Sequence, residues 1–528
     1  MSTGMAQEAI ATPAPSLAAA DPLPSGSTPR RFGIVPILAI VVTLAGLGVR
    51  IAFLGNQSYW ADEAFSVSQA AGALGRVFRI GYTEVHTPLY ASVLWVWERI
   101  GGTTTLWTHT LSGLFGAATV VAAYVCLRST PLSTTARWLA VAVTAANGFG
   151  IVYAQESRPY ALVLLGATGL TAVTVAQLMA STPRRRTSTI GWLAWALLTA
   201  TSHLLGAVLV GATALLLAAD AARRRRYRDV AVQVAVSVLA VAPQAGWIVS
   251  GLQRGGFAAG TTWIRAPGLG DVQILLSTTF SAGGLLPRSD GFAWESTGGV
   301  AVAVVLLVIA SLFAFPRSGG ETWTADWVAG AVLLGLAAVT LTAMFLVSQA
   351  IHLWTLRNMI IIVPAVTWGV AWLVVGLPQW ALVRTLLAVA VLVASLTSFV
   401  PLVHDLARPY KTDWRGLVRY LDHERAAHPA MDVTLIGGGG PQDQFVVADR
   451  SSGTDLHLEP GYDRVEVHPR SDAAIARLRR ATGPQVVVYY GGIAHPRPLE
   501  AEHEILDRLA DPGCHSVPIY GLAVISCG

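Results

Sequence analysis

Long apolar runs separated by short polar segments recur along the chain from residue 33 to residue 403. The first of them, 33–54, is long enough to cross a bilayer as a helix that rises about 1.5 Å per residue. The run 190–220 is too long for one crossing and predicts two short spans that meet near His203. The pattern thus predicts eleven transmembrane helices, at 33–54, 107–128, 136–154, 159–181, 190–220 (two), 229–250, 298–315, 326–348, 358–376 and 382–403.

The run 88–100 is also apolar, but it is too short to span a membrane comfortably. Its two tryptophans are typical of a membrane interface. We therefore expect an interfacial helix at 88–100, preceded by a loop at 55–87 that follows the first span.

Arginine clusters indicate the orientation of the spans, because positive residues are retained on the cytoplasmic side. A pair of arginines precedes the first span, and two further clusters lie at 184–186 and 223–226. The N-terminus is then cytoplasmic, whereas the loop 55–87, the segment 155–158 and His203 lie at the outer face. Counting the remaining spans places the C-terminus outside as well.

The pattern changes from about residue 405, where charged residues return and short β-rich runs alternate with helical patterns. The β-rich runs lie at 433–436 and 486–490, and the helical patterns lie near 413–427, 471–481 and 498–510. We expect a small extracytoplasmic α/β domain, attached to a polytopic α-helical membrane protein. The predicted units are a disordered cytoplasmic tail, a transmembrane module with the outer loop 55–87, a second transmembrane module with the outer loop 251–297, and the α/β domain, at 1–31, 32–250, 251–404 and 405–528.

Composition agrees with a membrane protein, since 53% of the residues are hydrophobic and 13% are charged. These values exclude an ordinary soluble globular chain. The net charge of +5 accompanies arginine clusters between spans, so it marks topology and not a nucleic-acid surface. Cys126 lies inside a span, where we expect it to serve packing. Cys514 and Cys527 can form a disulfide if the C-terminal domain is extracytoplasmic.

Three polar elements gather at the predicted outer face, where water reaches them. Asp62 and Glu63 lie just beyond the first span, and an acidic pair can accept a proton or hold a metal ion. The segment 155–158 joins two spans, and Arg357 opens a third. An exposed loop acid or a helix cap is the structural alternative for the acidic pair. Together, however, the elements supply acids and cations at one membrane face.

Four segments follow one another as NQSYWADEAFS (56–66), HTPLY (86–90), YAQESRPYALVLL (153–165) and TSHLLG (201–206). In this order they resemble the polyprenyl-phosphate-sugar-dependent glycosyltransferases of the GT-C fold, above all family 39. That family includes protein O-mannosyltransferases and bacterial lipid A aminoarabinose transferases. The resemblance covers about residues 33–250, and Thr87 departs from the more usual His-Pro-Pro. The segment KTDWR that begins at Lys411 is similar to the start of the C-terminal domain in bacterial relatives.

The resemblance implies an inverting transfer of a sugar from a lipid monophosphate to a hydroxyl group. Asp62 would be the general base, with Glu63 as the fallback. Arg357 and then Arg158 are the candidates to contact the departing phosphate. Their structural alternatives are an interfacial anchor for Arg357 and, for Arg158, an ion pair with Glu156 or another acid that fixes the loop. The expected substrate-cavity residues are Trp60, His86, Tyr90, Gln155, Glu156, Tyr160, His203 and His352, of which His203 also suits a turn between two half-spans.

No cofactor and no metal ligand set is assigned, although the acidic pair leaves a divalent metal open. The expected partners are a polyprenyl-phosphate sugar, a glycan, lipid or protein acceptor, and the membrane lipids, with no nucleic acid. The bias toward Ala, Val, Gly and Arg is typical of a GC-rich genome and suggests a bacterial plasma membrane, for example in an actinobacterial envelope. Mannose, arabinose, glucose and amino sugars all remain open as the transferred sugar.

A polytopic transporter or lipid flippase is the rival function, because it too needs many spans and a few buried charges. Its charges should lie near the bilayer midplane, in broken helices and inverted repeats. We find no clear internal repeat, and the acidic pair lies in an outer loop. A non-catalytic envelope scaffold is a third alternative, in which the region of Asp62 would have no catalytic function.

Overall fold

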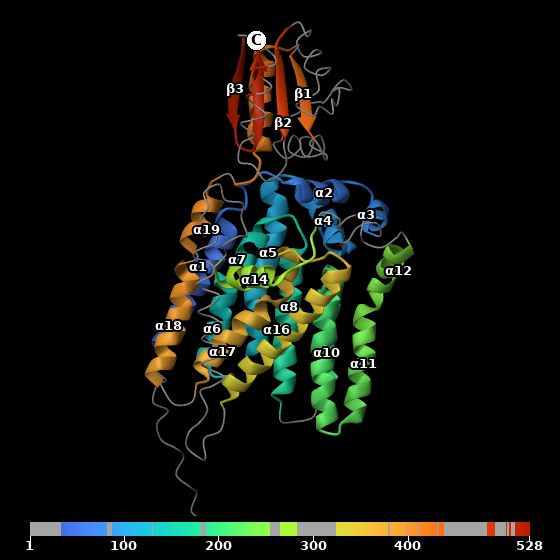
Figure 1. Ribbon diagram of the computed structural model, residues 1–528, viewed down its shortest axis with the longest axis vertical. Coiled ribbons are helices and arrows are strands. Elements are labelled where there is room, and N and C mark those ends of the chain that lie inside the picture. Colours follow the sequence, from blue (N-terminus) through green and yellow to red (C-terminus); the bar gives the residue numbers. More distant parts are fainter. Residues whose placement is uncertain are drawn as a thin grey trace, which may run out of the picture.

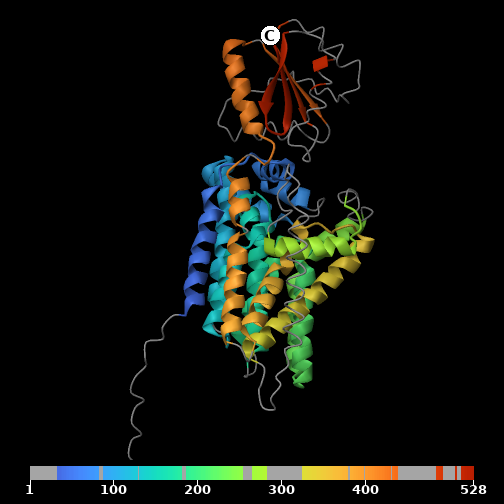
Figure 2. The ribbon, with the colours of Figure 1, turned by 60° about the vertical axis from the view of Figure 1, so that its left-hand side comes forward.

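The computed structural model is a bundle of helices with a small α/β unit beyond one end (Figures 1 and 2). It describes residues 33–81, 87–128, 130–180, 186–253, 264–281, 324–377, 381–397, 399–408, 410–429, 431–437, 483–490, 503, 506–507 and 513–528. Several predictions fall wholly or largely outside these residues: the tail 1–31, His86, the span 298–315 and the helices 471–481 and 498–510.

Seven helices in the described residues are long and apolar enough to cross a membrane, as expected of a multi-pass membrane protein. Six coincide with spans predicted from the sequence, and the seventh is the second half of the run 190–220. They are Ile34–Ala52 (α1), Thr105–Leu127 (α5), Tyr160–Leu178 (α8), Gly206–Arg223 (α10), Tyr227–Ser250 (α11 with most of α12), Ala325–Ala350 (α16) and Arg357–Val375 (the 3-10 turn η3 with α17).

The remaining helices of the bundle are shorter. The run 190–220 breaks at His203, as predicted, into α9 (Arg186–Ser202) and α10. The run 382–403 forms α18 (Ala381–Thr397) and α19 (Phe399–Leu406). The total of eleven spans stays a prediction, because it includes 298–315.

The predicted span 136–154 is bent by 51° between α6 (Thr134–Ala146) and the following helical turns Gly148–Gln155. Asn147 caps the second part, its side chain accepting a hydrogen bond from a backbone N–H at 3.2 Å. The wholly buried Arg50 of α1 donates to two carbonyls in the last turn of α6, at 2.7 and 3.2 Å. Backbone groups freed by a helix break inside a membrane need such partners.

Three short helices cover the end of the bundle that faces the α/β unit (Figure 1): α2 (Ala61–Ala71), α3 (Leu74–Gly81) and α4 (Pro88–Gly101). Pro88 occupies the first turn of α4, where proline suits a helix start. The helix does not meet the length expected of a span, in line with the predicted interfacial helix. Trp97 of α4 stacks on Trp107 of α5, with ring centroids 4.4 Å apart.

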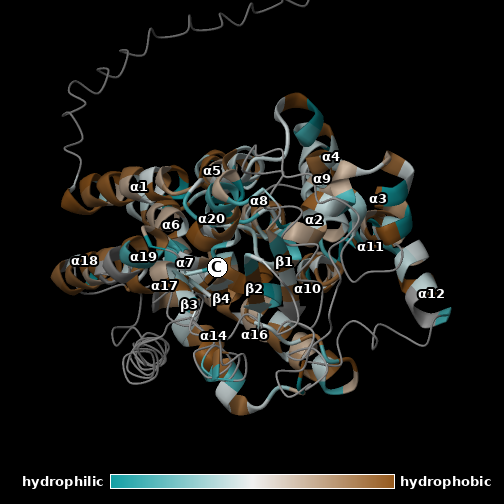
Figure 3. Ribbon diagram, turned by 90° about the horizontal axis from the view of Figure 1, so that it is seen from above, coloured by the Kyte–Doolittle hydropathy of each residue, from teal (hydrophilic) through white to brown (hydrophobic). Residues whose placement is uncertain are grey.

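The outer surface of the bundle is apolar, as lipid contact requires. Seen along the bundle from the α/β side, apolar residues line α1 and α18 (Figure 3). On α1, the exposed apolar side chains are Ile34, Ile37, Val41, Leu44 and Ile51. Helix α14 (Leu269–Ser281) lies across the bundle near the end that carries α2 (Figures 1 and 2).

The described part of the C-terminal region is an α/β unit. Its helix is α20 (Trp414–Ala427), and its strands are β1 (Asp432–Gly437), β2 (Gln485–Tyr490), β3 (Cys514–Ile519) and β4 (Leu522–Cys527). The sheet order is β1-β2-β4-β3, with β1 parallel to β2 and the other pairs antiparallel. Cys514 and Cys527 are register partners on β3 and β4 and form a disulfide. The boundaries and the extracytoplasmic position of this domain stay predictions.

Candidate active site

The acidic pair lies in the first turn of helix α2, at the end of the bundle near the α/β unit (Figure 1). Trp60 caps this helix, and its backbone N–H donates to the Glu63 carboxylate at 3.3 Å. Acids in a first turn are favoured by the partial positive charge of the helix N-terminus. Asp62 and Glu63 are adjacent, so their side chains point in different directions around the helix and meet different partners.

Asp62 is the accessible member of the pair, with 30% of its side chain exposed. Its Oδ2 accepts a hydrogen bond from Arg357 Nη1 at 2.8 Å and lies 3.4 Å from Arg158 Nη2. Arg158 also donates through Nη1 to the Asp62 backbone carbonyl and to Ser66 Oγ, both at 3.0 Å. The three predicted residues are therefore brought together, and the acid that pairs with Arg158 is Asp62.

Glu63 is completely buried and surrounded by donors. Its Oε1 accepts from His109 Nε2 at 2.7 Å and from the Ser157 backbone N–H at 2.8 Å, while Oε2 accepts from Lys411 Nζ at 2.7 Å. Burial alone would raise the pKa of Glu63, but the charges and hydrogen bonds of Lys411 and His109 outweigh it and lower the pKa to about 2. Glu63 is therefore a fully engaged carboxylate at neutral pH.

Lys411 connects Glu63 to Glu156, since its Nζ also lies 3.4 Å from Glu156 Oε1. Burial and the neighbouring Glu63 raise the pKa of Glu156, although Lys411 opposes this shift. Burial would lower the pKa of Lys411, but the two carboxylates raise it overall. Among the described residues, Glu156 Oε2 is buried without a hydrogen-bond partner.

Two other predicted residues lie beside the arginines. Trp60 lies under the Arg357 guanidinium, 5.3 Å from the ring centroid. Tyr160 is buried under Arg158, at 5.9 Å. His203 is buried near Tyr160, and burial together with Arg158 and Arg357 lowers the pKa of His203 to about 4. Its imidazole is therefore neutral at pH 7.

The remaining predicted cavity residues lie in other surroundings. Tyr90 is buried in apolar packing, with its hydroxyl 2.9 Å from Ser112 Oγ. Gln155 donates to the Val49 carbonyl at 3.0 Å. His352 is exposed and forms no hydrogen bond or ion pair with the described part of the chain. The cavity roles of these three residues stay predictions.

Sequence reasoning missed His109 and the placement of Lys411. His109 lies within the apolar run of α5, where an ionisable residue marks a function by default. Both of its ring nitrogens face acceptors, the Leu54 carbonyl at 2.6 Å and Glu63 at 2.7 Å. Lys411 is the only lysine in a chain that otherwise uses arginine. Either feature could have drawn attention to these residues.

No group of three or more potential metal ligands occurs among the described residues.

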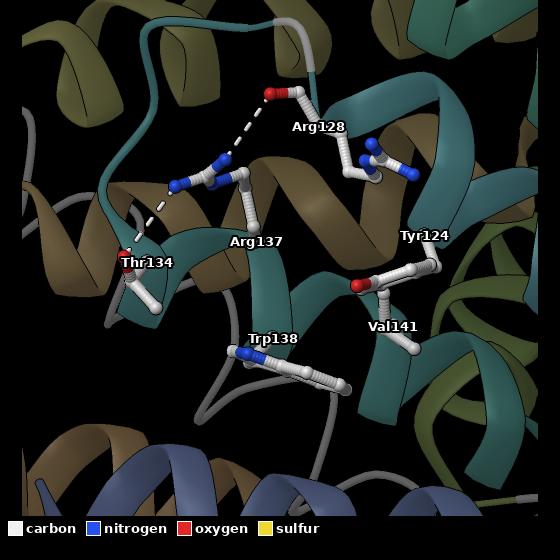
Figure 4. A pocket seen from close by; sticks show the side chains of 6 residues that line it. All are labelled: Tyr124, Arg128, Thr134, Arg137, Trp138 and Val141. Carbon is white, nitrogen blue, oxygen red and sulfur yellow. Dashed lines mark hydrogen bonds between the residues drawn. The ribbon is translucent and has the colours of Figure 1, made fainter. Parts of the chain in front are cut away.

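A cavity of about 300 Å³ lies at the C-terminal end of α5, whereas His109 lies near the start of that helix. Figure 4 shows the residues that line the cavity. Arg137 crosses it, donating to the Arg128 carbonyl at 3.2 Å and to Thr134 Oγ1 at 3.4 Å. The other lining residues are Tyr124, Trp138 and Val141. This cavity lies at the turn between α5 and α6, and none of the candidate catalytic residues lines it.

No protein-family model and no curated protein sequence matches the chain. Solved structures similar to it include ArnT from Cupriavidus metallidurans bound to undecaprenyl phosphate, at 14% identity over 93% of this chain and 97% of ArnT, with a TM-score of 0.39. The apo form of ArnT gives 12% identity over the same shares of the two chains and a TM-score of 0.41.

The Archaeoglobus fulgidus oligosaccharyltransferase tethered to an acceptor peptide is also similar, at 12% identity over 79% of this chain and 63% of that chain, with a TM-score of 0.42. ArnT and this oligosaccharyltransferase are both GT-C fold glycosyltransferases, the group that the sequence motifs resemble. At such low identities and TM-scores, the chemistry of the site rests on the residues of this chain.

Proposed function

We propose that this protein is a membrane glycosyltransferase that moves a sugar from a polyprenyl-phosphate donor to a hydroxyl acceptor at the outer face of a bacterial plasma membrane. The observation that carries the proposal is the placement of Asp62 between Arg357 and Arg158 at one end of the helix bundle. This placement offers a proton acceptor beside two phosphate-binding groups, which is the combination that such a transfer needs.

Asp62 fits the role of general base better than Glu63. A base must reach the acceptor hydroxyl, and the Asp62 side chain is 30% exposed whereas Glu63 is completely buried. Glu63 also accepts hydrogen bonds from His109, Ser157 and Lys411, and its low pKa makes it a poor proton acceptor. We therefore assign proton transfer to Asp62 and a positioning role to Glu63.

The two arginines suit a departing lipid phosphate, because a guanidinium matches phosphate oxygens in charge and shape. In the proposed step, the acceptor oxygen forms a bond to the anomeric carbon and its proton passes to Asp62. The bond from that carbon to the phosphate oxygen breaks, and the phosphate leaves with the electron pair. Arg357 and Arg158 stabilise the negative charge, and the single displacement inverts the anomeric centre.

The position of the cluster favours an enzyme over a transporter. A transporter's charges are expected near the bilayer midplane, whereas Asp62 begins a short helix at the end of the bundle and Glu63 binds Lys411 of the segment that leads to the α/β unit (Figure 1). Mannose, arabinose, glucose and amino sugars are retained as donor sugars. Protein, lipid and glycan hydroxyls are retained as acceptors.

The test uses the purified full-length protein in lipid nanodiscs with a panel of polyprenyl-phosphate sugars. We expect one donor to be consumed, with release of polyprenyl phosphate and formation of a glycoside of inverted configuration. Asp62→Asn should lose this activity, while Asp229→Asn, a matched change at the far end of the bundle, should keep it. Movement of intact donor across liposomes without any release of polyprenyl phosphate would favour the flippase instead.

A further inference from the structure

We propose that Lys411 is a positioning residue of the active site, through which the segment leading to the α/β domain holds Glu63 and Glu156 in place. The inference rests on the proposed function for its catalytic consequence, but the charge pairing itself does not. It makes the connection to the α/β domain a part of the catalytic centre instead of a passive linker.

The first support is the position of Lys411. It is the only lysine of the 528-residue chain, and only 5% of its side chain is exposed. Its Nζ lies 2.7 Å from Glu63 Oε2 and 3.4 Å from Glu156 Oε1. An ammonium is a compact charge that fits between two carboxylates, whereas a guanidinium is a wider planar group. The single departure from arginine thus occurs where a small buried cation is required.

The second support is the set of hydrogen bonds around Lys411, which we call the clasp: residues 55–58 bound to residues 406–415. Gln57 donates to the carbonyls of Leu406 and Arg408 at 3.2 and 2.8 Å, and accepts from the Tyr410 N–H at 3.1 Å. Arg415 donates to the carbonyls of residues 55 and 56, both at 2.9 Å. The loop that begins at the first span is thereby fixed to the segment that carries Lys411.

The consequence for catalysis follows from charge balance. Lys411 neutralises two buried carboxylates that would otherwise attract Arg158 and Arg357, the guanidinium groups of the same site. With Glu63 and Glu156 held by Lys411, these arginines stay beside Asp62 and available to the donor phosphate. Without Lys411, Glu156 has the strongest tendency to take up a proton, because it is buried and near Glu63.

The charged and titratable groups that face Lys411 and Glu156 decide how a test by pH is read. These groups are Glu63 of α2, His109 of α5, Tyr153 of the segment that follows α6, Arg357 of η3 and Tyr410 of the clasp. Burial raises the pKa of Tyr410, so its phenol is neutral at pH 7. Comparing a single variant with a double variant isolates Glu156 from the others.

The kinetic test compares Lys411→Met with the double variant Lys411→Met/Glu156→Gln. We expect the single variant to lower kcat about 10²-fold with a smaller change in donor KM, as for a displacement of about 1 Å. Its kcat relative to the unmodified protein should rise as pH falls, because protonation of Glu156 restores charge balance. The double variant should recover much of the activity and show a flat ratio. Arg419→Met, which removes an exposed cation from α20, is the matched control.

A role limited to filling space gives a different result: the single variant would be impaired equally at every pH, and the double variant would be no better. Either finding overturns the proposal.

Thermal unfolding measured across pH supplies a readout that needs no substrate. The stability lost in Lys411→Met should return as pH falls through the raised pKa of Glu156, and this pH dependence should vanish in the double variant. A protein without transferase activity that passes this unfolding test would refute the proposed function while leaving the pairing intact.

Discussion

Glu63 and Glu98 are both buried carboxylates, but their surroundings have opposite consequences for stability. Glu63 is engaged by His109 and Lys411, and its pKa is lowered to about 2. Burial raises the pKa of Glu98 to about 8, and both of its carboxylate oxygens lack a hydrogen-bond partner in the described residues. At neutral pH, Glu63 is thus charged and stabilises the fold through its ion pairs, whereas Glu98 is neutral.

We predict that Glu63→Gln destabilises the protein by about 3–5 kcal/mol at pH 7. The change leaves the buried charge of Lys411 with only one of its two carboxylate partners. A lowered folded-state pKa contributes stability above the unfolded pKa and loses it as pH falls toward 2. The unmodified protein should therefore lose stability as the pH falls from about 4.5 to 2, and the variant should not show this loss. Unfolding by denaturant in detergent measures both effects. Glu98→Gln is the matched control, and an equal loss in both variants would contradict the prediction.

Arg357→Gln is predicted to weaken donor binding more than acceptor binding. A hydrogen bond to a charged group contributes about 1.5–3 kcal/mol, which corresponds to about 10- to 100-fold in the donor dissociation constant. Binding of a polyprenyl-phosphate sugar to the protein in nanodiscs measures this change. If donor affinity is unaltered while the variant unfolds at the normal temperature, Arg357 serves only as an anchor at the membrane interface.

At the scale of elements, sequence reasoning succeeded where local pattern decides. The length of 190–220 predicted the break at His203, and 88–100 forms a helix, α4, that is too short for a span, as predicted; its interfacial position stays a prediction. It missed the 51° bend at Asn147, since the polar atoms that stabilise a bend come partly from a distant helix. The contact between Lys411 and Glu63 joins residues 348 positions apart, so only the packed fold could reveal it.

The clasp between residues 55–58 and 406–415 offers a test at this same scale. Because Lys411 is the only lysine, its reaction with a water-soluble amine reagent reports how often the clasp opens. We predict that Arg415→Ala, which removes two hydrogen bonds to loop carbonyls, raises the labelling rate at least about tenfold. Peptide mapping by mass spectrometry measures it. The exposed Arg419→Ala should leave the rate unchanged, and equal labelling of both variants would refute a clasp that controls access.

At the scale of the whole molecule, every proposed role depends on Asp62 and the α/β unit lying on the same side of the membrane. Helix α2, which carries Asp62, and the α/β unit lie at the same end of the bundle, in agreement with the charge pattern (Figure 1). That pattern assigns the end to the extracytoplasm, because Arg186, which begins α9, and the arginine cluster 223–226, where α10 ends, lie at the other ends of these helices. The orientation itself is a prediction from charge, which the arrangement of helices does not test.

The disulfide gives that orientation a chemical test. A Cys514–Cys527 bond persists only in an oxidising compartment, so protein isolated from intact cells without reductant should react with a maleimide at Cys126 alone after denaturation. Reduction should expose all three cysteines. In parallel, a reporter active only outside the cytoplasm, fused after Gly528, should be active. If all three cysteines react before reduction and only a cytoplasmic reporter is active, then the α/β unit and the end of the bundle that carries Asp62 face the cytoplasm. A polyprenyl-phosphate donor presented at the outer face would then be out of reach, and the proposed setting of the reaction would be wrong.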